Sequence, residues 1–286
     1  MHSLFQKTIN NKISCNSVSL HSGKNTSLTI IPSGPDTGII FRRIDLENGK
    51  NEIKADYKNV TTTNLGTTIQ NEFGAKVSTI EHLMAAIWGC GIDNLIIEID
   101  NIELPIMDGS SEPFVFLIEC AGINVQNKPR QFLELTKKIR YEEGDKYIEA
   151  LPAKEFSLDL HIDFNHPQID HLDLNYHQSS NSFKSDISRA RTFCFKEEID
   201  YMHQNGLAKG GSLANAIVVD RNGIINDEPL RYKDEFIRHK ALDFIGDLFL
   251  CGKYITAHFK CNKTGHTLNN KFLHKLFSDQ SSWKLN

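Results

Sequence analysis

The stretch EFIRHKALDFIGDL, residues 235–248, decides how the second half of the chain is organised. Its apolar residues recur at helical spacing, so the stretch predicts a long helix with one face on the core. The same helix carries His239, Asp243 and Asp247 four residues apart. Side chains at i and i+4 lie on one helical face, so an imidazole and two carboxylates form a stripe beside the apolar face.

A His and an Asp at this spacing can bind one metal ion and leave room for a third ligand and a water. The spacing is also common in helices without a metal, so His239 could equally be an ordinary core or surface histidine with two solvated aspartates. A purely structural metal site would need a fourth protein ligand, for which the sequence offers no obvious candidate.

The motif STIEHLM offers a carboxylate and an imidazole side by side at the start of another predicted helix. Ser78 and Glu81 have the spacing of a capping box, which would give Glu81 a structural role. The alternative is that this helix end faces a cleft. His82 would then be a third metal ligand, and Glu81 would take a proton from the metal-bound water.

Three weaker signals lie in the second half of the chain. His266 follows Gly265 in a predicted strand-to-helix turn, where it is either a catalytic group or part of a polar cap. Thr192, in SRARTFCF, could donate its hydroxyl to an oxyanion. Gly210 and Gly211 permit close approach of the backbone to another group.

Composition limits the class of protein. The 286 residues are 40% hydrophobic and 24% charged, as in a globular protein, and a net charge of −4 gives no sign of nucleic-acid binding. No apolar run reaches the length of a membrane span, and the first residues lack the apolar core of a signal peptide. The six cysteines contain no C-x-x-C pair, which argues against a thiolate zinc site and disulfides. A reducing cytoplasm is the expected location.

The element pattern predicts an α+β fold of two similar halves. Strand-like runs near 13–45, a helix from 78, a strand near 94–101 and a helix near 112–122 are followed by a comparable order after residue 131. Residues 124–131 are the candidate linker. The expected domains are therefore residues 1–126 and residues 127–286.

Several motifs occur together, in one order, over nearly the whole chain: VSTIEHLMAAIWGCGIDNLIIEID, ELPIMDGSSEPFVFLIECAGI, SRARTFCF, GGSLANAIVVD, DEFIRHKALDFIGDL and KTGHTLNNK. They closely resemble the UDP-3-O-acyl-N-acetylglucosamine deacetylases of lipid A biosynthesis. The resemblance implies a zinc-dependent amide hydrolase that removes the N-acetyl group from a UDP-linked, 3-O-acylated amino sugar.

The resemblance also implies roles for individual residues. The zinc ligands are His82, His239 and Asp243, with Glu81 as general base and His266 as general acid. Asp247 orients and charges that histidine, and Lys240 and Thr192 contact the substrate or the developing oxyanion. Phe164 and Lys263 match positions near the nucleotide end of the substrate. An acyl-chain passage is expected near residues 193–220, where Phe193 supplies an apolar wall and Gly210 and Gly211 allow close approach.

The implied fold is two β-sheet domains, each with two main helices, packed helix face to helix face. Small inserts near residues 61–76 and 196–220 carry part of the site, and a monomer is expected. One departure is Cys194, where the family usually has glycine. The alternatives are a zinc amidohydrolase acting on another acylated amino sugar and a non-catalytic sugar-nucleotide-lipid binding protein.

Overall fold

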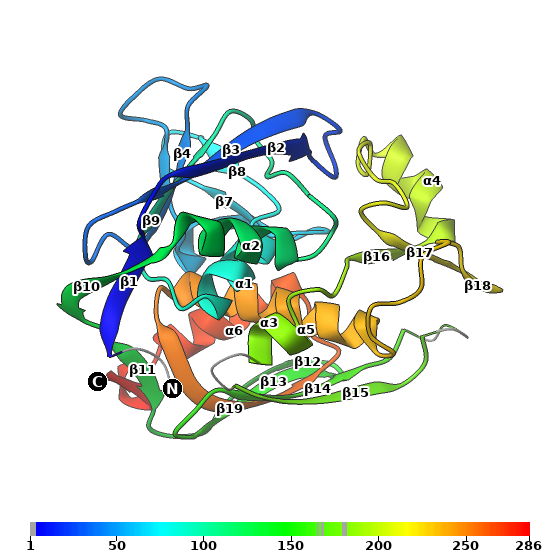
Figure 1. Cartoon of the computed structure of the whole chain (residues 1–286). Helices are drawn as coiled ribbons and strands as arrows, with labels where there is room; N and C mark the ends of the chain where they lie inside the picture. Colours follow the sequence, from blue (N-terminus) through cyan, green and yellow to red (C-terminus); the bar gives the residue numbers. More distant parts are fainter. Residues whose placement is uncertain (1–3, 165, 167–168, 179–181) are drawn as a thin grey trace.

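Two β-sheets form the outer layers of the molecule, and the main helices lie between them (Figure 1). The computed structural model describes residues 4–164, 166, 169–178 and 182–286. The strands of one large sheet come from residues 13–99, and those of the other come from residues 132–285. The predicted α+β architecture, with two sheet-and-helix units packed helix face to helix face, is confirmed.

The first large sheet has the strand order β2-β3-β9-β4-β5. Its strands are β2 (Ile13–Val18), β3 (Asn25–Pro32), β4 (Ile39–Arg43), β5 (Glu52–Lys54) and β9 (Leu95–Ile99). Buried and partly exposed residues alternate along β4 and β9, as expected for strands with one face on the core. The sheet therefore presents one apolar face to the helices.

The second large sheet is organised around a long strand, β19, which pairs with β13, β14 and β11. Its strands are β11 (Phe132–Leu135), β12 (Ile139–Glu143), β13 (Lys146–Pro152), β14 (Ser157–Ile162), β15 (Leu172–His177), β19 (Tyr254–Asn262) and β20 (Trp283–Leu285). The alternating burial along β19 and β14 again leaves one face for the helices.

The two halves meet where helices α1 (Glu81–Gly89) and α5 (Glu235–Leu248) cross. Every residue of α1 from Glu81 to Trp88 is buried, because α2 (Glu112–Ala121) and α5 both pack on it. Gly246 permits the crossing: a Cβ there would lie 2.1 Å from the carbonyl oxygen of Glu81. Helix α6 (His266–Phe277) packs on α5.

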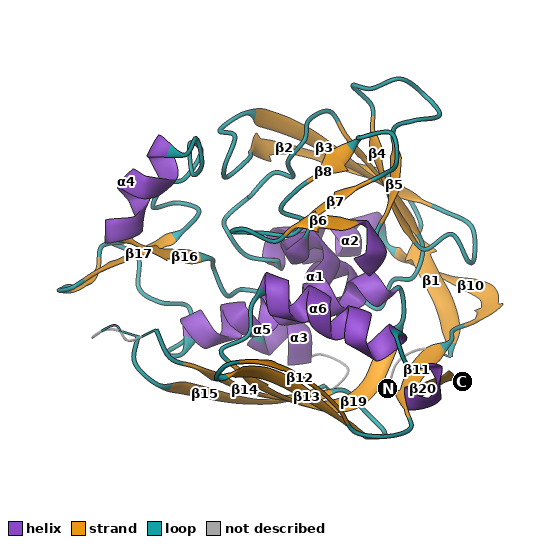
Figure 2. Cartoon of the chain, turned by 180° about the vertical axis from the view of Figure 1, so that it is seen from behind, coloured by secondary structure: helices purple, strands orange, loops and turns teal. Residues whose placement is uncertain are grey.

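The two predicted insert regions contain the smaller elements. Strands β6 (Val60–Thr62), β7 (Thr68–Gln70) and β8 (Lys76–Val77) form a three-stranded sheet in the first predicted insert. In the second, α4 (Lys196–Gln204) covers a small sheet that projects from the main layers (Figure 2). This sheet contains β16 (Phe193–Phe195), β17 (Ile217–Asp220) and β18 (Gly223–Ile224). The remaining helices are α3 (Ser182–Asp186) and the 3₁₀ turns η1 (Tyr57–Asn59), η2 (Phe249–Cys251) and η3 (Gln280–Ser282).

Two local predictions are wrong. Residues 124–131 are not a linker, because β10 (Ile123–Pro129) pairs with β1 (Phe5–Ile9) in a two-stranded sheet. The capping box is also absent, because the backbone of Ser78 forms an isolated β-bridge with Glu103 and its hydroxyl donates to the carbonyl of Ile102. The carboxylate of Glu81 is therefore not used to cap its own helix.

Within the described ranges, no helix combines the length and apolar character needed to cross a bilayer.

Candidate active site

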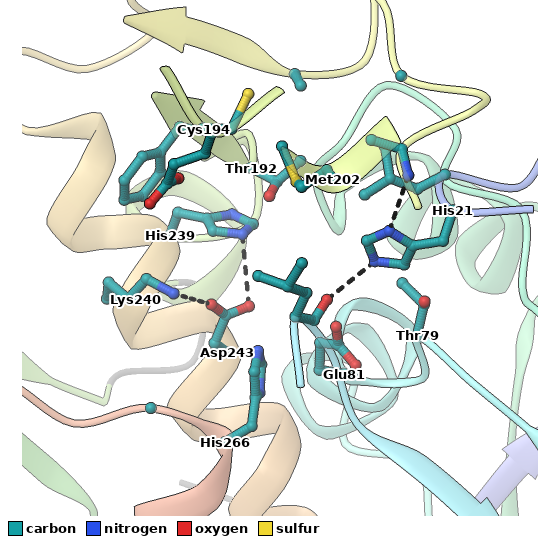
Figure 3. A pocket seen from close by; sticks show the side chains of 18 of the residues that line it. His21, Thr79, Glu81, Thr192, Cys194, Met202, His239, Lys240, Asp243 and His266 are labelled. Atoms are coloured by element: carbon teal, nitrogen blue, oxygen red, sulfur yellow. Dashed lines mark hydrogen bonds and ion pairs between the residues drawn. The ribbon is translucent and has the colours of Figure 1, made fainter. Parts of the chain in front are cut away.

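A cavity of about 730 Å³ opens where the two inserts meet the first turns of α1 and α6 and the middle of α5 (Figure 3). Most of the titratable side chains predicted for the site line it, although they come from distant parts of the sequence: Glu81, His82, His239, Lys240, Asp243, Lys263 and His266. Helix crossing explains the convergence, because the first turn of α1 lies against α5.

Three side chains form a candidate metal centre on the cavity floor. His82, His239 and Asp243 are buried and place one ligand atom each within 4.8 Å of the others. Asp243 Oδ1 lies 3.4 Å from Nε2 of His239 and 3.7 Å from Nε2 of His82. Ligand atoms in a tetrahedral zinc site lie about 3.4 Å apart, so the spacing of these three donor atoms fits a zinc ion.

The protonation of these groups also suits a metal. Burial, together with the neighbouring His239, lowers the pKa of His82 to about 3, and burial lowers the pKa of His239. His239 donates its Nδ1–H to the carbonyl of Ala190 at 2.9 Å, so the lone pair of Nε2 faces the cluster. Burial alone would raise the pKa of Asp243, but Lys240 and the surrounding histidines outweigh burial and lower it. Two neutral imidazoles and a carboxylate result.

Glu81 lies beside this cluster as a buried carboxylate. Its Oε2 accepts a hydrogen bond of 2.9 Å from the backbone N–H of Thr67. Burial and the negative charges of Asp247 and Asp243 raise the pKa of Glu81 to about 7, against the opposing effect of His266. A carboxylate with such a pKa can take up a proton near neutral pH, as a general base must.

His266 is the first residue of α6, and its ring lies between Asp243 and Glu81 in Figure 3. Its Nδ1 lies 2.8 Å from Oδ2 of Asp247. Burial alone would lower the pKa of His266, but the charge and hydrogen bond of Asp247 outweigh burial and raise the pKa to about 10. The ring is therefore an imidazolium at neutral pH, with Nε2–H available as a donor.

Two further polar groups, Thr192 and Lys240, line the cavity. Thr192 is held by backbone hydrogen bonds of 2.8 Å to Gly109 and Ile217, which fix the position of its hydroxyl at the cavity wall. Lys240 donates from Nζ to Oδ2 of Asp243 at 2.8 Å and also lines the cavity. Both can contact a substrate oxygen near the metal centre.

The second insert supplies an apolar wall. Its lining residues are Phe193, Cys194, Ile199, Met202, Ala216 and Val218. Gly211 lines the cavity, whereas Gly210 packs against the backbone of residues 18–23, where a Cβ would lie 2.2 Å from the carbonyl oxygen of Ser19. Phe164 lies behind this wall, with its ring against those of Phe193 and Phe195.

Three residues at the site were not singled out from the sequence. Thr67 contacts Glu81 and Asp247, and Asn269 donates to Oδ2 of Asp247 at 2.8 Å. The His21 ring lies within hydrogen-bond distance of Leu65 in the first insert and Ala208 in the second. The Thr-rich composition of the first insert was a signal for Thr67 only in the general sense that this insert was expected to carry part of the site.

Buried neutral imidazoles and a carboxylate that open onto a cavity, next to a proton acceptor and a proton donor, are typical of enzymes that activate water at a metal. The fold and cavity thus define a metal-dependent hydrolase. Residues 6–278 match the family model described as UDP-3-O-acyl N-acetylglycosamine deacetylase. The chain belongs to that family.

Individual relatives agree with the family match. A protein of Actinobacillus succinogenes named UDP-3-O-acyl-N-acetylglucosamine deacetylase is 48% identical over 281 residues, covering 98% of this chain and 92% of the relative. Proteins of the same name from Vibrio parahaemolyticus and Tolumonas auensis are each 46% identical with the same coverage. This chain is therefore similar to these relatives over almost all of its length.

Proposed function

We propose that this chain is a zinc-dependent hydrolase that removes the N-acetyl group from UDP-3-O-(3-hydroxyacyl)-N-acetylglucosamine. The products are the free 2-amine and acetate, and the reaction is an early committed step of lipid A synthesis. Family membership supports the reaction. The observation that carries it is the buried cluster of His82, His239 and Asp243, which lies next to Glu81 and His266 on the floor of a large cavity.

His82, His239 and Asp243 would hold the zinc ion. When bound, zinc supplies a Lewis acid for the amide carbonyl and lowers the pKa of water to about 7. The remaining chemistry falls to side chains of this chain. Glu81 accepts the proton of the attacking water, and the hydroxyl of Thr192 donates to the carbonyl oxygen as negative charge develops there.

His266 completes the reaction as the proton donor. An amide nitrogen is a poor leaving group until it is protonated, and His266 is the imidazolium in the cavity. Asp247 accepts a hydrogen bond from Nδ1–H and keeps the ring charged, so that Nε2–H is the proton directed toward the reacting atoms. Lys240 supplies a further positive charge to the cavity.

The cavity also suits an amphipathic substrate. Its apolar wall in the second insert matches a fatty-acyl chain, which gains about 0.8 kcal/mol per buried methylene. Lys146 and Lys263 line another part of the cavity, and a nucleoside diphosphate would compete there with Asp145 and Asp163, which are paired with Lys263. Phe193 would lie at the boundary between the two, with the ring of Phe164 packed behind it.

A deacetylation assay with the metal-reconstituted protein tests the proposal. Acetate should be released from the UDP-linked, 3-O-acylated substrate, and much more slowly from the same compound without its acyl chain. His82→Ala should release none. Equal rates on both compounds would favour a general amino-sugar deacetylase, and substrate binding without acetate release would favour a non-catalytic binding protein.

Three coarser properties are part of the same proposal. The cysteines at 15, 90, 120, 194, 251 and 261 are all free thiols in the described chain, which is consistent with a reducing cytoplasm. We also propose that the protein acts as a monomer. We divide the chain into domains of residues 1–126 and 127–286, a boundary that falls within β10.

A further inference from the structure

Thr67 lies between the two groups that would move protons. It precedes β7 in the first insert and is 2% exposed. Its backbone N–H donates to Oε2 of Glu81 at 2.9 Å, and its hydroxyl donates to Oδ1 of Asp247 at 2.6 Å. The hydroxyl oxygen also lies 3.4 Å from Nδ1 of His266. One residue is therefore in contact with the carboxylate that accepts a proton and with the pair that donates one.

The backbone at Thr67 is shaped for this contact. Gly66 has a φ of +150°, and a Cβ on it would lie 3.0 Å from Oε1 of Glu81. A side chain at that position would press on the carboxylate, whereas glycine lets the main chain lie against it. The carbonyl of Thr67 accepts from the N–H of Ile80 at 3.4 Å, so the segment is also tied to the start of α1.

The hydroxyl of Thr67 completes the surroundings of Asp247. Oδ2 of this carboxylate accepts from Nδ1 of His266 and from Nδ2 of Asn269, each at 2.8 Å. Oδ1 accepts from Thr67. A buried carboxylate oxygen without a donor is costly, so loss of the Thr67 hydroxyl would let Asp247 and the attached ring reorient.

Thr67 itself is not among the described residues that line the cavity, so it acts through its neighbours. We propose that Thr67 is a positioning residue for the deacetylation. Its backbone N–H and its hydroxyl hold Glu81 and the Asp247–His266 pair in fixed relative positions. The proton acceptor and the proton donor then both face the substrate amide. The inference rests on the proposed function, because it assumes that these groups transfer protons.

Thr67→Val tests the role of the hydroxyl, because valine keeps the β-branched shape and the backbone N–H. We expect kcat to fall roughly 10–100-fold, the usual effect of losing a hydrogen bond behind a catalytic group, with KM within about twofold. Zinc content should stay at the wild-type level. Thr67→Ser restores the hydroxyl and should return kcat to within a few-fold of wild type.

Thr68→Val is the matched control, because it makes the same chemical change at the next residue, the first of β7. It should leave kcat unchanged. A double-mutant cycle locates the effect: in an Asp247→Asn background, Thr67→Val should cost less than about twofold further. A full additional loss there, equal losses in Thr67→Val and Thr68→Val, or failure of Thr67→Ser to restore kcat would each overturn the positioning role.

A measurement independent of turnover separates this inference from the proposed function. In protein labelled with ¹⁵N-histidine, the Nδ1–H resonance of His266 reports its hydrogen bond to Asp247. We expect it to shift in Thr67→Val and to stay in place in Thr68→Val. An inactive wild type with this shift would contradict the proposed reaction alone, whereas an active wild type without it would contradict the role of Thr67 alone.

Discussion

Glu81 and His266 have opposite protonation preferences although they lie beside the same cluster. Burial raises the pKa of Glu81 to about 7, and Asp247 outweighs burial to raise the pKa of His266 to about 10. Near pH 7 a carboxylate that can accept a proton therefore lies next to an imidazolium that can donate one. When the surroundings shift the pKa values of two groups in this way, they define which group is the base and which is the acid.

Replacing the proton acceptor should separate metal binding from turnover. Glu81→Gln keeps an oxygen that can accept from the N–H of Thr67, but it cannot take a proton from water. We expect full zinc content and a loss of about 10²–10⁴ in kcat, the usual size of a general-base contribution. Metal analysis and steady-state kinetics check this. Near-normal turnover with zinc in place would mean that Glu81 is only structural.

The alkaline limb of the pH–rate profile should report His266. The active form is protonated, so activity is present at lower pH and is lost as pH rises through the pKa of His266, which is about 10 before the opposing charge of a bound cation is added. Asp247→Asn removes the negative charge that raises this pKa, so the limb should move to lower pH. An unmoved limb in the Asp247→Asn profile would assign it to another group.

At the scale of elements, the crossing of α1 and α5 brings the three proposed metal ligands together. His82 lies one residue into α1, and His239 and Asp243 lie on consecutive turns of α5. The helices approach closely because position 246 has no side chain, with the backbone of Glu81 and Ala85 in contact with it. The geometry of the proposed metal site thus depends on Gly246, a residue that is not itself one of the proposed ligands.

Gly246→Ala should therefore weaken the site from a distance. The added methyl would lie 2.1 Å from the carbonyl oxygen of Glu81, so one of the two helices must move. We expect a loss of about 1–3 kcal/mol in the free energy of unfolding, typical of overpacking, together with weaker zinc binding. Gly34→Ala is the control, because its nearest neighbour would lie 3.9 Å away and neither property should change. Unaltered zinc affinity in Gly246→Ala would show that the crossing tolerates a wider spacing.

The second insert should set the preference for acyl length. Ala216 is buried and lines the cavity beside Ile199 and Met202. Each methylene sheltered there should change kcat/KM about fourfold, as expected for 0.8 kcal/mol. Ala216→Leu narrows the passage and should reduce kcat/KM for long acyl chains more than for short ones. Ala214→Leu, at an exposed position, should reduce neither. Equal losses across the chain-length series would place the acyl group elsewhere.

The sequence predicted those features of the fold and the site that depend on residues close together in the chain. The spacing of His239, Asp243 and Asp247 on one helical face needs only helix geometry, and the strands and helices of both halves follow from local patterns. The contact of Thr67 with Asp247 joins residues 180 positions apart, and no spacing rule reaches that far. Glu81 shows the same limit. Its neighbours in the sequence predicted a helix cap, whereas its carboxylate accepts a hydrogen bond from Thr67 in the first insert.

At the scale of the whole molecule, the proposed metal centre lies between the two halves of the chain. One proposed ligand, His82, belongs to the helices of the first half, and the other two proposed ligands belong to α5 in the second. Residues 1–126 contribute the first large sheet, and the second comes entirely from residues beyond 131. An ion bound at this position therefore acts as a link across the helix layer, in addition to its part in the chemistry.

Removing the metal should lower the stability of the whole molecule. A ligand that binds only the folded state stabilises it by about 2.7 kcal/mol at a free concentration of 100 times Kd, and these ligands converge only when both halves are packed. Calorimetry should show a higher Tm with zinc than after chelation. In His82→Ala the chelator should have little effect on Tm, because the remaining ligands, His239 and Asp243, both lie on α5 and no longer link the halves. A chelator-induced drop in Tm as large in His82→Ala as in wild type would mean that the stabilising ion sits elsewhere.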